Sequence, residues 1–269
     1  MSTVIGSNIV AQDQVVPLNS GFIGYTNYVN TSNISTANSD PSFPITNAAN
    51  PATNFRWRAN NSAGRVITIQ NNGAIINYIG IARHNLVQEK IQVKIDFNGV
   101  TVRDFQPVFN QQSLLFLFEE ASPNTIEIYI QDPSNINSSV GDPLEIAVIY
   151  CGLGIRLERN IYVGHTPITM GRDRTSINGV SQSGEYLGEI VTNQSLSTNV
   201  TLSNLTPDWY RTNLDPFFSR NPRAPCFWAW RPSKYPAEVG YCWVTGNPRP
   251  TNSRANGMMD VSWDLVGIA

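Results

Sequence analysis

The sequence predicts an all-β chain, with an N-terminal jelly-roll β-sandwich followed by a second β-sandwich or barrel domain that carries one short helix. Two observations support this class. Only 14% of the residues are charged, and Asn, Ser, Thr, Gly and Pro are so common that strong helix formers are scarce. Short apolar and β-branched runs recur along the chain with turn residues between them. The 269 residues suffice for two domains. We expect residues 1–155 to form the first and 156–269 the second.

The strands of the first domain are expected after a polar, turn-rich stretch over residues 1–64. Arg65 to Gln70 is a β-branched run, and the Asn-Asn-Gly sequence at 71–73 is typical of a hairpin turn. Within 90–97 and 125–130 the apolar residues alternate, which places them on one face of a strand. Six or more strands at this spacing favour a sandwich or jelly roll. Further strands are expected at 74–82, 100–105, 113–118 and 144–155.

The second domain is expected to begin with a loop over residues 160–185. Thr206-Pro207-Asp208 is typical of a helix start, with an N-cap, a proline in the first turn and an acidic residue near the positive end of the dipole. Pro216 is expected to end this helix. Strands are expected at 186–192, 196–202, 225–230, 240–244 and 258–268.

Composition and the chain start argue against several functional classes. The net charge is −2 and lysine occurs only at 90, 94 and 234, so the clustered cations that bind nucleic acid are missing. The start has no cationic region followed by an apolar core, as a signal peptide would. The longest apolar run, 146–155, is far shorter than a membrane helix. We therefore expect synthesis in the cytoplasm, no membrane insertion and no nucleic-acid partner.

The sequence offers little for reaction chemistry. His84 and His165 are the only histidines, and the sequence lacks the zinc-binding, phosphate-binding and nucleophile-elbow motifs. Cys151, Cys226 and Cys242 do not have metal-site spacing, although Cys226 and Cys242 lie in neighbouring apolar segments, as free thiols or as a disulfide. Glu119 and Glu120 are adjacent on an expected strand and should point to opposite faces. We expect no enzyme activity, no metal and no cofactor.

Three groups of residues are candidates for binding, each with a purely structural alternative. Arg83, His84 and Asn85 follow a strong strand, where they either face a ligand such as a sugar or bond loop backbone. Arg172 and Arg174 form either a subunit contact or a solvated turn. Trp228 and Trp230 share one strand face, which is covered by the chain itself or by another subunit, with sugar stacking as a third alternative.

Two parts of the sequence resemble known families. The Phe-Arg-Trp-Arg run at 55–58, the strand at 66–69 and the run Tyr78 to Leu86 resemble the entry to a galactose-binding-like, or discoidin-type, jelly roll. In that family a Trp-containing turn precedes an alternating strand and a later strand ends in His-Asn, so Trp57 and His84-Asn85 would match. Such domains often bind glycans or a structural calcium, but no acidic loop cluster here matches the calcium site. The half from Gly154 to the end is similar to phage distal-tail or baseplate-ring subunits in the runs Gly154-Ile-Arg-Leu, Pro216-Phe217-Phe218, Phe227-Trp228-Ala229-Trp230 and Tyr235-Pro236.

These resemblances imply a structural virion protein of a bacteriophage tail tip or baseplate. It would form a homo-oligomeric ring and connect the tail to fibre or hub proteins, with the jelly roll projecting towards fibres or a host surface glycan. The rival hypothesis is a carbohydrate-binding module or host-receptor-binding protein that uses Trp57, Arg83, His84 and Asn85. A glycan hydrolase is the third hypothesis. It would need two carboxylates about 5–10 Å apart in a cleft, and the sequence shows no sign of them.

Overall fold

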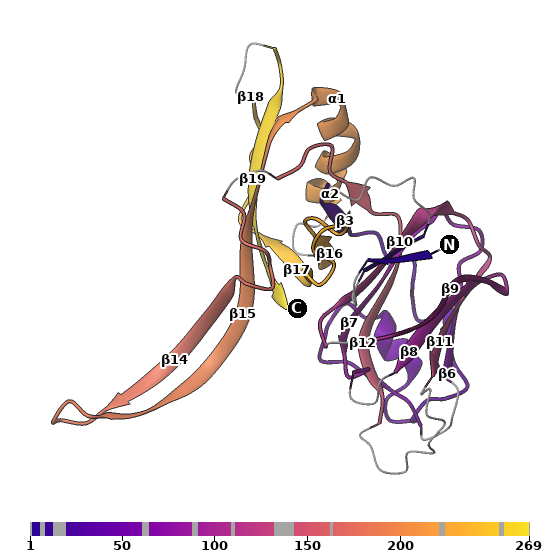
Figure 1. The fold of residues 1–269 in the computed structure, drawn as a ribbon, viewed down its shortest axis with the longest axis horizontal. Helices are drawn as coiled ribbons and strands as arrows, with labels where there is room; N and C mark the ends of the chain where they lie inside the picture. The colour runs from indigo at the N-terminus through magenta and orange to yellow at the C-terminus, as the bar shows by residue number, and fades with distance from the viewer. Residues whose placement is uncertain are drawn as a thin grey trace.

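The computed structural model describes residues 2–5, 9–12, 20–60, 65–87, 91–108, 111–131, 143–161, 164–220, 224–252 and 256–268. Most of these residues lie in strands, which form three sheets (Figure 1). Two sheets make up the jelly roll. The third lies beside it and extends into a long hairpin that projects from the body. The all-β prediction is therefore confirmed.

The jelly roll is a sandwich of a six-stranded and a five-stranded sheet. All pairings are antiparallel except that of β2 with β10. One buried cluster fills the space between the sheets, with Ile67 and Ile69 from one sheet and Ile79 and Ile81 from the other. The spatial order of the six-stranded sheet is β1 (Ser2–Ile5), β2 (Ile9–Gln12), β10 (Leu114–Ala121), β7 (Ile76–His84), β12 (Glu145–Gly152) and β5 (Trp57–Arg58). The order of the five-stranded sheet is β4 (Ile34–Ser35), β6 (Arg65–Gln70), β11 (Thr125–Gln131), β8 (Gln92–Phe97) and β9 (Val100–Pro107).

Two Asn-Gly turns illustrate what local sequence determines. Asn98 and Gly99 have φ values of 50° and 77° and join the paired strands β8 and β9, as a two-residue hairpin turn should. Asn72 and Gly73 have φ values of 52° and 74°, so the predicted turn forms. However, it leads from β6 in one sheet to β7 in the other, so it is not a hairpin. Turn residues specify backbone angles and do not specify which sheet receives the next strand.

The third sheet has eight strands and is built mainly from the second half of the chain. The alternation at the end of the sequence is confirmed: Val261, Trp263 and Leu265 are buried, while Ser262 and Asp264 are exposed. The order is β13 (Ile155–Arg156), β3 (Phe22–Gly24), β16 (Cys226–Ala229), β17 (Val239–Thr245), β19 (Met259–Ile268), β15 (Tyr186–Leu205) and β14 (Arg172–Val180), with β18 (Thr251–Asn252) beside β19.

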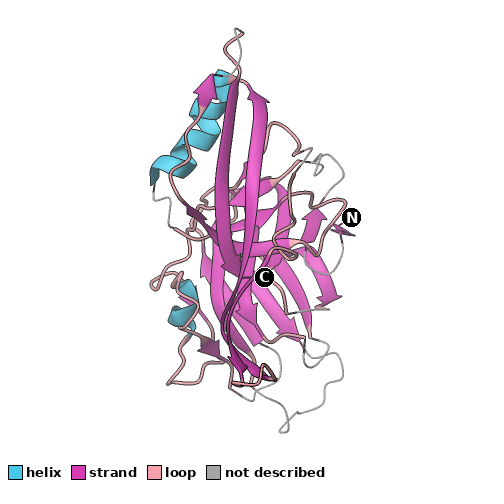
Figure 2. Cartoon of the chain, turned by 90° about the vertical axis from the view of Figure 1, so that its left-hand side faces the viewer, coloured by secondary structure: helices cyan, strands magenta, loops and turns pink. Residues whose placement is uncertain are grey.

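One face of the third sheet is covered by a helical segment, which Figure 2 shows as the longer of two helical stretches. It consists of α1 (Pro207–Trp209), the π-helical η2 (Tyr210–Leu214) and α2 (Asp215–Arg220). The expectation that Pro216 ends the helix is wrong. The wider π turn lies directly before Pro216, where a regular turn would need the N–H that proline lacks. The other stretch is the 3-10 helix η1 (Ile45–Ala49). Within the described part of the chain, no helix is long and apolar enough to cross a membrane.

The opposite face of the third sheet packs on the jelly roll through aromatic rings. Phe227 lies 5.6 Å from Tyr150 and 5.1 Å from Tyr241, ring centre to centre. A side chain at Gly80 would meet the Phe227 ring at 2.5 Å, so only glycine allows the two sheets to approach this closely. The Tyr241 hydroxyl donates to the carbonyl of Pro51 at 2.7 Å. The second sheet of the C-terminal sandwich is thus the six-stranded sheet of the jelly roll.

The predicted boundary between residues 155 and 156 falls within the two-residue strand β13. β3 lies in the first half of the sequence, yet it pairs with β13 and β16 of the third sheet. The polypeptide therefore crosses between the two parts more than once. The division into two domains stays a prediction.

Candidate functional site

The hairpin that projects from the third sheet is the most distinctive feature of the surface, and we call residues 172–195 the arm. It consists of β14, the turn at 181–185 and the first half of β15 (Figure 1). β19 pairs with β15 only from Leu196 to Leu205. Over Tyr186 to Ser195, β14 is therefore the one strand partner of β15 among the residues that the structure describes. The loop expected over 160–185 is wrong for residues 172–180.

The arm exposes apolar side chains to an unusual degree. The exposed fractions of Ile177, Val180, Tyr186, Leu187 and Ile190 lie between 61% and 69%. Ile177 is directly opposite Ile190 in the pairing register, so the two share a face. Val180 is opposite Tyr186 and lies three residues from Ile177, so this second pair is on the other face of the ribbon. Single exposed apolar residues are ordinary, whereas several on both faces of one short ribbon are unusual.

Polar groups occupy the arm nearer its base. Arg172 and Arg174 are exposed on β14, and the Arg174 guanidinium lies 3.7 Å from the Glu189 carboxylate. Such an exposed pair contributes little to stability. The structure places both predicted interface arginines on the arm, and their contact with another subunit stays a prediction.

The predicted ligand-binding residues lie at one end of the jelly roll. Trp57 is fully buried, and its indole N–H donates to the Ser39 hydroxyl at 2.9 Å. His84 is 6% exposed, and its Nε2 lies 2.8 Å from the carbonyl oxygen of Gln112. Burial lowers the pKa of His84 to about 4, since the charged ring would lose its water. In this conformation neither ring offers a face to a sugar.

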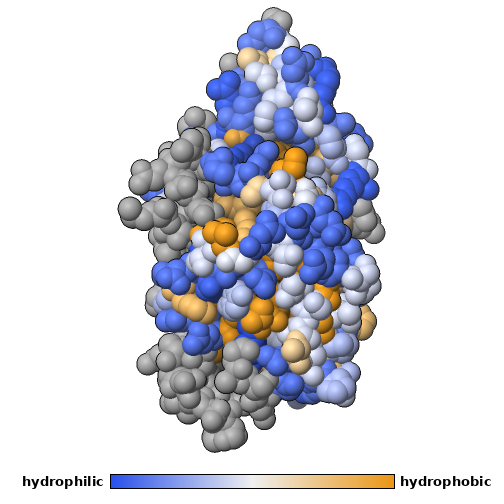
Figure 3. Space-filling view, turned by 90° about the vertical axis from the view of Figure 1, so that its right-hand side faces the viewer, coloured by the Kyte–Doolittle hydropathy of each residue, from blue (hydrophilic) through white to orange (hydrophobic). Residues whose placement is uncertain are grey.

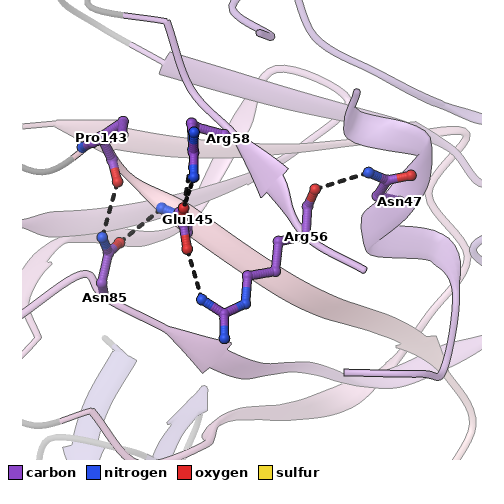
Figure 4. A network of polar contacts seen from close by, with 6 residues as sticks. All are labelled: Asn47, Arg56, Arg58, Asn85, Pro143 and Glu145. Atoms are coloured by element: carbon purple, nitrogen blue, oxygen red, sulfur yellow. Dashed lines mark hydrogen bonds and ion pairs between the residues drawn. The ribbon is translucent and has the colours of Figure 1, made fainter. Parts of the chain in front are cut away.

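Asn85 belongs to a network that closes the same end of the jelly roll (Figure 4). Its side-chain amide donates to the carbonyl of Pro143 at 2.9 Å and accepts from the backbone N–H of Glu145 at 2.7 Å. The Glu145 carboxylate accepts from Arg56 at 2.8 Å and from Arg58 at 2.7 Å. Asn85 therefore bonds loop backbone, as the structural alternative expected.

Two ionisable groups at this end, Glu145 and Arg83, differ in their surroundings. Partial burial tends to raise the pKa of Glu145, but hydrogen bonds from Arg56 and Arg58 outweigh it and lower the pKa. Arg83 is exposed, with a φ of 52° that is unusual for a residue other than glycine. Of the four predicted ligand-binding residues, Arg83 alone is fully at the surface. Ligand binding by this group stays a prediction.

A polar pocket of about 550 Å³ lies between the jelly roll and the helical segment. Glu119 and Glu120 both line it, whereas alternation on a regular strand would separate them. The register of β10 against β7 shifts between Leu117 and Ala121, and this irregularity breaks the alternation. The expectation that the two side chains point to opposite faces stays a prediction. The other lining residues are Tyr25, Asn77, Leu153, Gly154, Ile155, Arg156, Thr212 and Asn213.

Charges of both signs face this pocket. Burial lowers the pKa of the Arg156 guanidinium, and the nearby charges of Glu119 and Glu120 partly offset that effect. The Asn77 amide is already occupied, since it donates to the carbonyl of Gly154 and accepts from its N–H. Among the described residues, no three His, Cys, Asp or Glu side chains are grouped so as to hold a metal ion.

The C-terminal aromatic residues pack inside the chain. Trp228 is fully buried beneath the helical segment, 6.4 Å from Trp263 between ring centres. Trp230 is partly buried and stacks on Tyr235 at 5.2 Å. Trp228 thus has no exposed surface for another subunit in this conformation. Cys226 and Cys242 face each other across β16 and β17 as thiols, with their sulfurs 4.0 Å apart.

Comparison with known proteins gives little further information. No family model matches the sequence, and no curated protein matches it. Among solved structures, a chitosan-binding module from a chitosanase/glucanase of Paenibacillus sp. IK-5 is 6% identical and covers 47% of this chain and 98% of its own, with a TM-score of 0.36. The fourth CBM32 of GH89 from Clostridium perfringens is 18% identical, over 46% and 99%, with a TM-score of 0.35.

A third structure, the CBM32 of AlyQ in complex with 4,5-unsaturated mannuronic acid, is 15% identical over 48% of this chain and 96% of its own, with a TM-score of 0.36. Likenesses this weak carry no argument about what this chain binds. Its own surface, and above all the arm, has to supply that argument.

Proposed function

We propose that this chain is a non-catalytic structural subunit that assembles with neighbouring copies of itself through the arm. The observation that carries this proposal is the group of exposed apolar side chains on a two-stranded ribbon that stands away from the body. An isolated two-stranded ribbon is marginally stable in water. Contact with a neighbour would bury these side chains and order the ribbon.

Energetics favour this role for the arm over a purely structural one. Burying an aliphatic side chain of this size stabilises an assembly by about 1.5–3 kcal/mol. The four aliphatic side chains of the arm and Tyr186 would together offset much of the cost of association, which is roughly 4–15 kcal/mol. Inside the chain these side chains contribute little, because they remain in water.

More specifically, we propose that the chain is a subunit of a bacteriophage tail tip or baseplate and is present in the virion as a ring. This form is supported by the sequence resemblance alone. Mass spectrometry of purified virions tests it, and a protein consistently missing from particles would contradict it.

Shortening the arm tests self-assembly. Arg174 and Gln194 are paired, so residues 175–193 can be replaced by Asn-Gly, which joins the paired positions through a tight turn. We expect the intact chain to have a multiple of the 29.8 kDa monomer mass by light scattering after size exclusion, and the shortened chain to have the monomer mass. At concentrations too low for assembly, both should unfold at the same temperature. An intact chain that is monomeric up to high concentration, or a shortened chain that still assembles, would reject the proposal.

A second candidate function is carbohydrate binding, and the observation that supports it is the polar pocket. Its volume lies in the usual range for ligand pockets, and Glu119 and Glu120 offer acceptors for sugar hydroxyls. We expect a glycan array to identify a ligand whose binding falls at least tenfold in Glu120→Gln and is unchanged in Trp57→Phe. The absence of binding to any glycan at millimolar concentration would reject this function.

A further inference from the structure

We infer that the outer edge of β14 pairs, in antiparallel orientation, with β14 of a second copy of this chain, so that two arms form one four-stranded sheet. This inference rests on the proposed self-assembly and specifies how the arm takes part in it. It goes beyond exposed apolar side chains, because it assigns the contact to backbone hydrogen bonds along one strand edge.

The position of β14 leaves its edge open. It is the last strand of the third sheet, and its one strand neighbour within the described residues is β15. Figure 1 shows β14 on the side of the arm that is turned away from the jelly roll. Every second residue of Arg172–Val180 therefore presents its backbone N–H and C=O outward.

The two edges of the arm differ in regularity. Both irregularities in the pairing of β14 with β15 place the extra residue on β15, at Leu187 and at Thr192. Such bulges twist a strand and interrupt its ladder, and they are a common protection against unwanted pairing. β14 has no extra residue over its nine positions, and neither lysine nor proline interrupts it. The unprotected edge is therefore the one that faces outward.

The sequence of β14 suits pairing with itself. In an antiparallel pair around a two-fold axis at Ser176, all nine residues find partners and the two strands keep the same faces. No position then places like charges opposite each other. Ser176 faces its own copy, and the other pairs are Arg172 with Val180, Asp173 with Gly179, Arg174 with Asn178 and Thr175 with Ile177.

This register also improves the burial of apolar groups. Thr175 of one copy is placed beside Ile177 of the other, on the face that already carries Ile177 and Ile190. Cross-strand pairs of β-branched residues stabilise a sheet by about 0.2–1 kcal/mol each. The contact is closed by its two-fold symmetry, so it produces a dimer. A ring would need a further contact elsewhere on the chain.

Opposite charges at the symmetry axis provide the test. In Ser176→Lys, the Cβ atoms of two lysines would lie about 4.5–5.5 Å apart across the axis, and in Ser176→Glu those of two glutamates would do so. We expect each variant alone to dissociate at least tenfold more readily than the unmodified chain in sedimentation experiments. An equal mixture of the two variants should form dimers again, each with one Ser176→Lys copy and one Ser176→Glu copy. The control is Asn193→Lys, an exposed position on the bulged strand, which should dimerise normally.

Each outcome separates this inference from the broader proposal. If shortening the arm abolishes assembly while Ser176→Lys and Ser176→Glu assemble normally, the arm acts through its apolar faces and the edge pairing is wrong. If the mixture fails to regain dimers although both variants remain folded, the two-fold register is wrong. If the shortened arm has no effect on mass, both the inference and the proposed function fail.

Discussion

The loop end of the jelly roll and the arm carry side chains of similar kinds in opposite circumstances. At the jelly-roll end, Trp57 and His84 are buried, and both of them and Asn85 hydrogen-bond to groups of the same chain. On the arm, Ile177 and Ile190 are mostly in water. Residue type alone would have selected the first region as the binding site. Binding surfaces are therefore better recognised by the groups that the fold leaves without contacts, such as apolar side chains in water, than by residue type.

The remaining surface supports this contrast. Figure 3 shows the jelly-roll side of the molecule, where hydrophilic side chains are interspersed with small apolar patches. Such a mixture is ordinary for a protein surface. Exposed apolar residues named along the arm are instead consecutive or directly paired.

The largest effect should come from truncating the buried tryptophan. We expect Trp57→Ala to lose about 3–5 kcal/mol of unfolding free energy, because it leaves a cavity and an unpaired Ser39 hydroxyl. The matched arm variant Ile177→Ser should change stability by less than about 0.5 kcal/mol while weakening self-association. Chemical denaturation of both variants below the association range measures this. Equal losses of unfolding free energy in the two variants would contradict the contrast between a buried jelly-roll end and an exposed arm.

A smaller effect is expected from pH. The pKa of His84 is about 4 in the folded chain and about 6.5 when unfolded, so the unfolded state takes up more protons between these values. Stability should therefore be full above pH 6.5 and fall by up to roughly 3 kcal/mol towards pH 4. His84→Gln should be less stable at pH 7 and should show a shallower slope in that window. An identical slope in the variant would assign the pH dependence to other groups.

The smallest effect is expected at Glu145. Its pKa is lowered in the folded chain, so its contribution to stability is present above the ordinary carboxyl pKa and is lost as the pH falls through the lowered, folded-state pKa. We expect Glu145→Gln to cost about 1 kcal/mol or less at pH 7 and progressively less as the pH falls through that range. Urea unfolding at pH 7 and at pH 3 checks this. A variant with the same stability as the unmodified chain at pH 7 would show that the Arg56 and Arg58 pairs contribute nothing.

Local patterns in the sequence predicted the elements well. Strands with one buried face were found because alternation reports burial, as at 125–130 and 259–265. Cys226 and Cys242 were expected in neighbouring apolar segments, and they are direct partners across β16 and β17. The Asn98-Gly99 hairpin forms because Asn and Gly tolerate the positive φ values that its turn requires.

Local sequence patterns did not predict strands that lack a buried face, or contacts between residues that are distant in sequence. β14 has no buried face, so its residues read as a loop, although they pair along their whole length with β15. Glu119 and Glu120 line one pocket, at a place where the pairing of β10 with β7 is irregular. The tight approach of Gly80 to Phe227 depends on two sheets distant in sequence.

Amide hydrogen exchange of the arm, measured in dilute and in concentrated solution, reports whether a second copy covers β14. We expect the amides of residues 175–180 to exchange rapidly in dilute solution and at least tenfold more slowly in concentrated solution, while the amides of β7 exchange slowly in both. Rapid exchange of the arm at every concentration would contradict the claim that a second copy covers it.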